Sequence, residues 1–274
     1  QGADVAGRIV AVGESVPSER IGQRVLVDPW LRDPSDPGNR NLATYLGSER
    51  DGGFAQYTTL PAENAFVINS RLTDAELATF PCSYSTAENM LHRVGLGEGE
   101  KIFIPGASGG VGSALVQLAK RRGAWVLAMT GRTKMDAIRD LGADEVVARG
   151  QENLAHQMGA IIRGDEVDVV ADVVGGPDFS IWFELLCRGG RYVTSGAIAG
   201  PIVELDLRTL YLKDLEMHGA TVLPPGIFDN LVGYIERGDI RPLLAGEFSI
   251  NDIRIAQEAF LAKKHIGNFV ILPQ

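Results

Sequence analysis

The sequence has few cysteines, few histidines and no long apolar run. Its 274 residues include two cysteines, Cys82 and Cys187, and four histidines. Two cysteines do not make a disulfide framework, so we expect the reducing environment of the cytoplasm. No apolar stretch approaches the roughly 20 residues that a membrane-spanning helix needs. The first residues also lack the pattern of a secretory signal. We therefore expect no membrane partner.

An excess of basic residues is also lacking. The chain has 26 Lys and Arg against 35 Asp and Glu, which gives a net charge of −9 at pH 7. This charge opposes binding to nucleic acid and to anionic membranes. The one basic run, at residues 120–122, closes a predicted helix, where cations suit the negative end of the dipole. We therefore expect no nucleic-acid partner.

The pattern of hydrophobic and turn residues divides the chain into three parts. Residues 1–72 have short apolar runs punctuated by glycine and proline, which is typical of β structure. From Thr73, which with Glu76 has the pattern of a helix cap, strands and helices alternate to residue 237. Residues 238–274 predict strand, helix and strand. The predicted class is α/β, with a doubly wound parallel sheet in 73–237 and a β domain from 1–72 and 238–274.

Several element boundaries can be predicted from periodicity. The expected strands cover residues 102–104, 145–147, 167–174, 191–195 and 216–221. The expected helices cover residues 83–94, 134–141, 153–162, 177–186, 227–237 and 253–263.

The strongest motif is the segment IFIPGASGGVG at residues 102–112. Such a glycine run is weak on its own, because many turns contain two or three glycines. Here it joins a predicted strand to a predicted helix, as a dinucleotide pyrophosphate requires. The helix N-terminus offers free N–H groups, and residues without side chains let the backbone approach. The candidate pyrophosphate residues are Gly106, Ser108, Gly109, Gly110, Val111 and Gly112.

The next strand predicts which dinucleotide binds. An NAD site usually has a carboxylate near the end of this strand, about 20 residues after the glycines. No carboxylate occurs from Trp125 through Lys134, whereas cations that can meet a 2′-phosphate do. They could equally be ordinary cations at the start of a surface helix. The missing acid favours NADPH, with candidate residues Thr130, Gly131, Arg132 and Lys134.

The order of segments resembles the medium-chain dehydrogenase/reductase superfamily over nearly the whole chain. The resemblance rests on GADVAGRIVAVGESV, DGGFAQYTTLPAENAFVI, PCSYSTAENML, the glycine motif with its helix, LGADEVV, GGRYVTSGA and IGNFVIL. It implies a GroES-like β domain from both ends of the chain and a Rossmann domain between them. It also implies that further strands of the β domain precede Gln1, and that the protein is a homodimer or homotetramer.

The superfamily has a zinc-dependent branch and a zinc-free, quinone-oxidoreductase-like branch. The zinc branch has a Gly-His-Glu segment where this chain has Gly2-Ala3-Asp4, and Ala3 cannot bind a metal. The loop 31–51, where structural zinc cysteines would lie, has no cysteine, and the four histidines are scattered. We therefore expect no metal.

The resemblance also assigns residues outside the glycine motif. Cys82 matches the last zinc ligand of the metal branch; it could be a remnant ligand, a reactive thiol near the nicotinamide or a small buried residue, and the local sequence favours the last. Thr86 matches a threonine that lies against the nicotinamide ring. Further residues along the cofactor are Val174, Gly175, Ser195, Gly196 and Ala197.

The predicted activity is zinc-independent, NADPH-dependent transfer of hydride to a quinone, an enone or a related carbonyl compound. Cys82 and Thr86 are the candidate catalytic residues. The proton could come from Ser83, Tyr84, Ser85 or a bound water. Two alternatives stay open: a zinc alcohol dehydrogenase with unusual ligands, and an NADPH-binding protein without catalysis.

Overall fold

The computed structural model describes residues 1–150, 154–162 and 166–273. The chain divides into two compact units: unit 1 comprises residues 1–85 and 222–274, and unit 2 comprises residues 86–221. Helix α2 (Pro81–Arg93) contains the first of these boundaries. The sequence predicted domain limits at 72/73 and 237/238. These differ from the unit limits at 85/86 and 221/222, and they stay a prediction.

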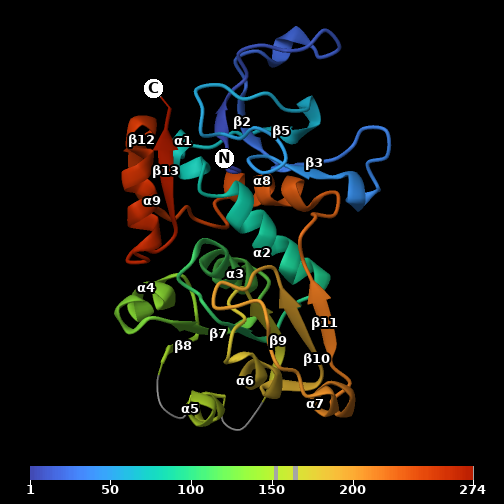
Figure 1. Cartoon of the computed structure of the whole chain (residues 1–274), viewed down its shortest axis with the longest axis vertical. Helices are drawn as coiled ribbons and strands as arrows, with labels where there is room; N and C mark the ends of the chain where they lie inside the picture. The colour runs from blue at the N-terminus through green and yellow to red at the C-terminus, as the bar shows by residue number, and fades with distance from the viewer. Residues whose placement is uncertain (151–153, 163–165, 274) are drawn as a thin grey trace. The chain divides into compact units, whose positions relative to one another are not determined.

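Unit 2 contains a six-stranded sheet (Figure 1). Its strands follow the order β11-β10-β9-β6-β7-β8, and all neighbours are parallel. This confirms the predicted α/β class. The strands are β6 (Lys101–Ile104), β7 (Trp125–Thr130), β8 (Glu145–Ala148), β9 (Val167–Asp172), β10 (Leu186–Thr194) and β11 (Glu216–Gly219).

The connections run in two directions from the middle of this sheet. From β6 the chain moves through β7 to β8 at one edge, and from β9 through β10 to β11 at the other. Right-handed crossovers therefore place the two sets of helices on opposite faces. The strand order reverses between β6 and β9, where ligands of such sheets bind. The helices are α3 (Gly110–Arg121), α4 (Met135–Asp140), α5 (Leu154–Ile161), α6 (Phe179–Glu184) and α7 (Leu207–Leu212), with a 3-10 turn η4 (Arg132–Lys134).

Some boundaries in unit 2 differ from the prediction. The helix expected over 177–186 ends at Glu184, because Leu186 is fully buried and pairs with Val167 as the first residue of β10. Helix α7 was not predicted. It is short, and Asp206 is its N-cap, because the Asp206 carboxylate accepts a hydrogen bond from the Arg208 N–H. The first residue expected for the helix 153–162 lies outside the described residues.

The core of unit 2 is aromatic. Trp182 is fully buried, and its ring lies 5.0 Å from that of Phe103 between the centroids. Phe179 and Phe183 pack against Tyr192 with centroid separations of 5.3 and 5.4 Å. These rings join α6 to β6 and β10, so the helix fixes the position of strands that carry candidate cofactor residues.

Unit 1 consists of short strands and helices. Strands β1, β2 and β5 form an antiparallel sheet in that order, β3 pairs with β4, and β12 pairs with β13. Within residues 52–68, part of the predicted β region, only β5 is a strand. The strands are β1 (Ala6–Arg8), β2 (Arg24–Val27), β3 (Trp30–Leu31), β4 (Thr44–Tyr45), β5 (Ala65–Val67), β12 (Leu244–Ser249) and β13 (Asn268–Leu272).

The helices of unit 1 include one predicted cap. Helix α1 (Asp74–Leu77) begins with the expected capping box between Thr73 and Glu76. Helices α8 (Ile227–Arg237) and α9 (Ile253–Leu261) lie in the C-terminal part. The 3-10 turns are η1 (Ser18–Arg20), η2 (Arg40–Leu42), η3 (Ala62–Asn64) and η5 (Ile250–Asp252).

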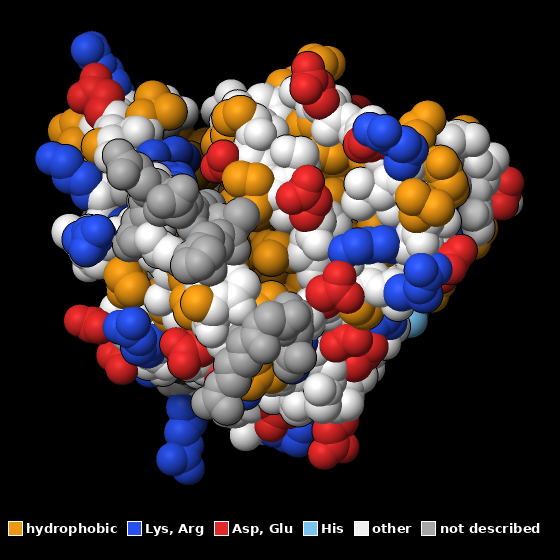
Figure 2. Space-filling view, turned by 90° about the horizontal axis from the view of Figure 1, so that it is seen from below, with side chains coloured by type: hydrophobic (Ala, Val, Ile, Leu, Met, Phe, Trp, Pro, Cys, Tyr) orange, Lys and Arg blue, Asp and Glu red, His pale blue; other side chains and the backbone are white. Residues whose placement is uncertain are grey.

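The described helices are all too short or too polar to cross a bilayer. Figure 2 shows charged side chains of both signs interspersed on one face of the molecule.

Replacing Phe103 with alanine should destabilise the protein strongly. Phe103 is fully buried against Trp182, and a Phe→Ala change in a core costs about 3 to 5 kcal/mol of unfolding free energy. Denaturant unfolding measures this loss. Ile202→Ala is the control, because Ile202 is 89% exposed and its loss should leave stability nearly unchanged. Equal midpoints for both variants would contradict the core assignment.

Candidate functional site

The turn between β6 and α3 has the geometry of a phosphate cradle. Gly106 has φ +72°, a conformation that side chains disfavour. A Cβ on Gly112 would lie 2.3 Å from the carbonyl oxygen of Gly106, so only glycine allows the helix to start against the turn. Helix α3 begins after Gly109 with no side-chain cap. Its first N–H groups are thus available to an anion at the positive end of the helix dipole.

The end of β7 contains an unsatisfied hydroxyl. Thr130 is 3% exposed, and its Oγ1 has no hydrogen-bond partner among the described residues. An unpaired buried hydroxyl costs free energy, and a ligand or an ordered water at this strand end is a partner that would remove that cost. The space beside it is open, because nothing lies within 4 Å of a Cβ built on Gly131. A ribose at this strand end fits both observations.

A buried carboxylate organises the end of β9. Asp172 is fully buried and accepts hydrogen bonds from the N–H groups of Val174 (2.6 Å) and Gly175 (3.1 Å) and from the Tyr192 hydroxyl (2.7 Å). Burial raises its pKa, while the donors oppose that rise. The same environment raises the pKa of Tyr192, so its hydroxyl stays a donor. Asp172 thus fixes the backbone of two predicted cofactor residues.

The loops after β9 and β10 lie against each other. The Ala199 N–H donates to the carbonyl of Val174, and the Gly176 N–H donates to that of Gly200. A Cβ on Gly175 would lie 2.8 Å from the Gly200 oxygen, and one on Gly106 would lie 2.7 Å from a methyl group of Val174. The glycine turn and the loop after β9 are therefore neighbours at the point where the strand order reverses.

Most predicted cofactor residues thus follow neighbouring strands of one sheet. Gly106–Gly112 follow β6, Gly131–Lys134 follow β7, and Val174–Gly175 follow β9. Ser195, Gly196 and Ala197 follow β10. The residues fit a nicotinamide dinucleotide, since they combine a free helix N-terminus, a glycine that permits close approach and an orphaned hydroxyl.

Helix α2 carries Thr86 and Cys82 four residues apart, which places them on one face. From Pro81 through Leu91 these two residues are half-buried and all the others are buried. Cys82 is therefore more accessible than the favoured interpretation as a small buried residue predicted. Thr86 has the accessibility that contact with a ligand requires.

Two residues far away in sequence bind Cys82 within unit 1. The Tyr45 hydroxyl donates to Cys82 Sγ at 3.0 Å, and the Cys82 N–H donates to Asp4 Oδ1 at 2.7 Å. The Trp30 ring packs edge-on against Tyr45, with centroids 4.8 Å apart. Sequence reasoning missed Tyr45, because no local signal links it to a cysteine 37 positions away.

Desolvation of the carboxyl group shifts the acid–base behaviour of this cluster, although the Asp4 residue as a whole remains exposed to solvent. Desolvation raises the pKa of Asp4 to about 6, partly offset by the N–H of Cys82. Desolvation and the neighbouring thiol raise the pKa of Tyr45, so the phenol stays protonated and remains the donor to sulfur. A phenol and a carboxyl group supply no cation to stabilise a thiolate. The cluster does not favour Cys82 as a nucleophile.

The candidate proton donors near Cys82 are engaged inside unit 1. The Tyr84 hydroxyl donates to the carbonyl of Arg241 at 2.7 Å, and the Ser85 hydroxyl donates to that of Cys82 at 3.3 Å. Ser83 accepts from the Asn268 side chain at 3.4 Å. Asn268 also donates to the carbonyl of Thr79 at 2.8 Å and joins β13 to the segment before α2.

The donor set does not fit a zinc site. Within residues 1–150, 154–162 and 166–273, no three His, Cys, Asp or Glu side chains come together in a group that could hold a metal ion. Ala3 contributes no ligand, and Cys82 and Asp4 are joined through a backbone N–H. The prediction of no metal stays a prediction that metal analysis can test.

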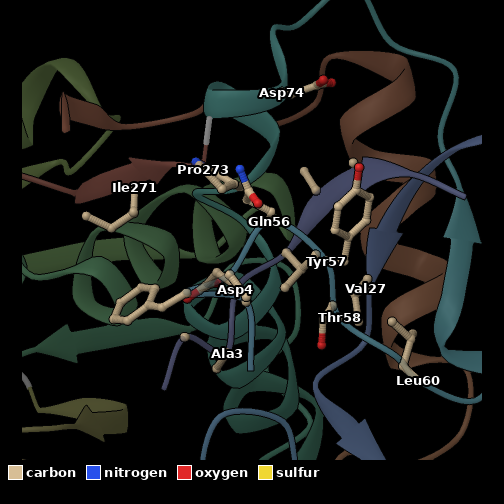
Figure 3. A pocket seen from close by; sticks show the side chains of 18 of the residues that line it. Ala3, Asp4, Val27, Gln56, Tyr57, Thr58, Leu60, Asp74, Ile271 and Pro273 are labelled. Atoms are coloured by element: carbon tan, nitrogen blue, oxygen red, sulfur yellow. The ribbon is translucent and has the colours of Figure 1, made fainter. Parts of the chain in front are cut away.

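Unit 1 also contains a large cavity of about 1500 Å³ (Figure 3). Its wall is mainly apolar and includes Val27, Leu60 and Ile271, with Asp4 among its few charged groups. Pockets for small ligands are usually about 300 to 1,000 Å³ and enclose their ligand with convergent polar groups. The volume exceeds this range, so we assign no small-ligand site to the cavity.

Two family descriptions match the chain. The alcohol dehydrogenase GroES-like domain matches residues 1–70, and the zinc-binding dehydrogenase family matches residues 110–237.

Individual proteins match over nearly the whole chain. A crystal structure of a candidate alcohol dehydrogenase from Sinorhizobium meliloti 1021 is 50% identical with a TM-score of 0.94, covering 100% of this chain and 76% of that one. An acryloyl-coenzyme A reductase of Metallosphaera sedula is 28% identical, covering 98% of this chain and 82% of the relative. An NAD-dependent alcohol dehydrogenase of Sulfurisphaera tokodaii is 25% identical, covering 99% and 81%.

Replacing Gly112 with alanine should weaken dinucleotide binding. The added methyl group would meet the Gly106 oxygen at 2.3 Å and force α3 away from the turn. We expect affinity to fall by on the order of tenfold or more, measured by calorimetric titration, because the N–H groups no longer converge. Gly159→Ala is the control, because a Cβ there meets nothing within 4 Å. Unchanged affinity of Gly112→Ala would contradict the cradle.

Replacing Asp4 with asparagine should alter how stability depends on pH. The folded-state pKa of Asp4 is raised from 3.8 to about 6, so the folded protein holds this proton more tightly than the unfolded chain. Its contribution is fully present below pH ~4 and is lost as pH rises through ~6. Asp4→Asn should therefore be more stable than wild type above pH ~6 and equal to it below ~4. Denaturant unfolding across this range tests this, with Glu14→Gln on an exposed turn as the control.

Proposed function

Since the chain belongs to the medium-chain dehydrogenase/reductase superfamily, we propose that it transfers hydride from NADPH to an electrophilic carbon without a catalytic zinc. The substrate is a quinone, an enone or a related carbonyl compound such as an enoyl thioester. The observation that carries the proposal is the combination of Ala3 at the histidine position with an acid-free strand end at Thr130–Lys134.

The proposed cofactor follows from the charges beside β7. Thr130 presents an unpaired hydroxyl, Gly131 leaves space, and Arg132 and Lys134 follow in η4. A carboxylate here would repel a 2′-phosphate, whereas two cations attract it. The relative from Sulfurisphaera tokodaii is named NAD-dependent, so the acid-free strand end is the feature that supports NADPH over NADH in this chain.

The residues of this chain bind and orient the proposed cofactor. When bound, the nicotinamide supplies a hydride to the electrophilic carbon of the substrate. The N–H groups at the start of α3 hold the pyrophosphate, and Gly112 allows the backbone to approach it. The Asp172 carboxylate fixes Val174 and Gly175 along the cofactor, and Thr86 fixes the ring. Because Tyr84 and Ser85 donate to carbonyls within unit 1, Ser83 and a bound water are the favoured proton sources.

An activated alkene is the favoured substrate class. An acryloyl thioester, the substrate named for the Metallosphaera sedula relative, has an electrophilic β-carbon next to a carbonyl group. Hydride addition at that carbon places negative charge on the carbonyl oxygen, and a proton on the α-carbon completes the reduction. Reduction of the carbon–carbon double bond involves no alcohol or alkoxide, so it does not require a metal to position one.

An enzyme assay and a metal assay test the proposal on the full-length protein. NADPH oxidation is followed with a quinone, an enone, an enoyl thioester and an aldehyde, with and without a chelator. We expect turnover with at least one of the first three substrates and no effect of the chelator. One tightly bound zinc per subunit together with chelator-sensitive activity would replace the proposal with an alcohol dehydrogenase. Cofactor binding without turnover across the panel would indicate a non-catalytic protein.

Replacing Thr86 with valine should lower turnover more than substrate affinity. The change keeps the shape of the side chain and removes the hydroxyl, whose hydrogen bond contributes about 1 kcal/mol or somewhat more. We therefore expect kcat to fall by roughly tenfold, with a smaller change in KM. Steady-state kinetics measures this. Thr209→Val is the control, because Thr209 is also a half-buried helical threonine and lies on α7. Unchanged kcat would remove Thr86 from the catalytic site.

A further inference from the structure

The register of the sheet brings a third cation to the proposed cofactor site. Strands β7 and β8 pair in parallel, with Thr130 opposite Ala148. The next residue, Arg149, donates its backbone N–H to the carbonyl of Thr130 at 2.7 Å. Arg149 therefore lies directly beside the turn that starts at Gly131, although the sequence separates it from that turn by the whole of α4.

The guanidinium groups at this edge have no protein partner. Across the described ranges, no hydrogen bond or ion pair engages the side chain of Arg132 or Arg149. The contrast is with the other described arginines of unit 2, such as Arg139 on the following helix, which pairs with Asp136 at 2.8 Å. Both side chains are exposed and can reorient. In a chain with a net charge of −9, two unpaired arginines at one strand edge favour an anion as their partner.

The same edge has a feature that points to a ribose. The Thr130 hydroxyl is buried without a partner in the described part of the chain, and open space adjoins Gly131. A ribose hydroxyl or its phosphate ester can satisfy this group. The orphaned hydroxyl lies on β7, and Arg149 and Arg132 follow the ends of β8 and β7. An anion held by these arginines would therefore lie beside the adenosine ribose of the proposed cofactor.

We propose that Arg149 determines cofactor specificity by pairing, together with Arg132, with the 2′-phosphate of NADPH. This inference rests on the proposed cofactor and adds a residue to its recognition. A phosphate dianion accepts paired N–H donors from two planar guanidinium groups, one from each strand end. NADH has a neutral hydroxyl at this position and gives the two arginines no anionic partner, so Arg149 contributes discrimination rather than general affinity.

Binding of two adenosine fragments tests this role. Adenosine 2′,5′-bisphosphate carries the 2′-phosphate, and adenosine 5′-monophosphate lacks it. For Arg149→Gln we expect an affinity loss of about ten- to a hundredfold for the bisphosphate and less than about twofold for the monophosphate, as for loss of a hydrogen bond to a charged group. Arg149→Lys should restore part of the loss, because it keeps the charge. Calorimetric titration measures the six affinities of wild type and the two variants for the two fragments.

Two further measurements separate specificity from structure. In steady-state kinetics, Arg149→Gln should raise the KM for NADPH, leave kcat nearly unchanged and leave the KM for NADH unchanged. Its bisphosphate affinity should also depend less steeply on salt than that of wild type. Arg188→Gln is the control: it removes an exposed cation of unit 2 that pairs with Asp214, and it should change none of these values.

The possible failures are distinguishable. Equal bisphosphate affinity for Arg149→Gln and wild type, with a loss for Arg132→Gln, would overturn the role of Arg149 and leave the NADPH proposal standing. Equal affinity of wild type for both fragments would overturn the NADPH proposal and the role of Arg149 together. An equal loss for both fragments in Arg149→Gln would indicate a structural role and would also overturn the inference.

Discussion

The fully buried carboxylate of Asp172 is the interaction on which the edge of unit 2 with the candidate cofactor residues depends. A charged group away from water is tolerated only when donors surround it, and here two backbone N–H groups and a phenol do so. The two N–H groups belong to the loop after β9, and the phenol belongs to β10. One side chain therefore fixes the turn at the point where the strand order reverses. Loss of any donor would leave a buried acceptor partly unsatisfied.

The sequence alone predicts the parts of this site that are local. The glycine turn, the strand before it and the helix after it follow from residues 101–121, because glycine chemistry and apolar spacing act over short distances. The alternation of strands and helices likewise predicts the parallel sheet. The boundary errors occur where tertiary packing decides: Leu186 continues a helical pattern, yet its pairing with Val167 makes it a strand residue.

Contacts set by register could not be predicted. Arg149 comes next to Thr130 only because β7 and β8 pair in one particular alignment. Tyr45 reaches Cys82 through the arrangement of strands in unit 1, and no spacing rule indicates that hydrogen bond. Asp172 offered a weaker signal, since a carboxylate that ends an apolar strand needs donors nearby. Sequence analysis thus misses residues whose partners lie on another strand.

The unpaired hydroxyl of Thr130 has a consequence for the protein without its ligand. A polar atom that is shielded from water and lacks a partner makes the folded state locally frustrated, and a valine there would pack with less conflict. A cofactor that satisfies the hydroxyl removes this conflict and stabilises the folded state at the same time. Binding of the proposed cofactor and the stability of the fold would then be linked.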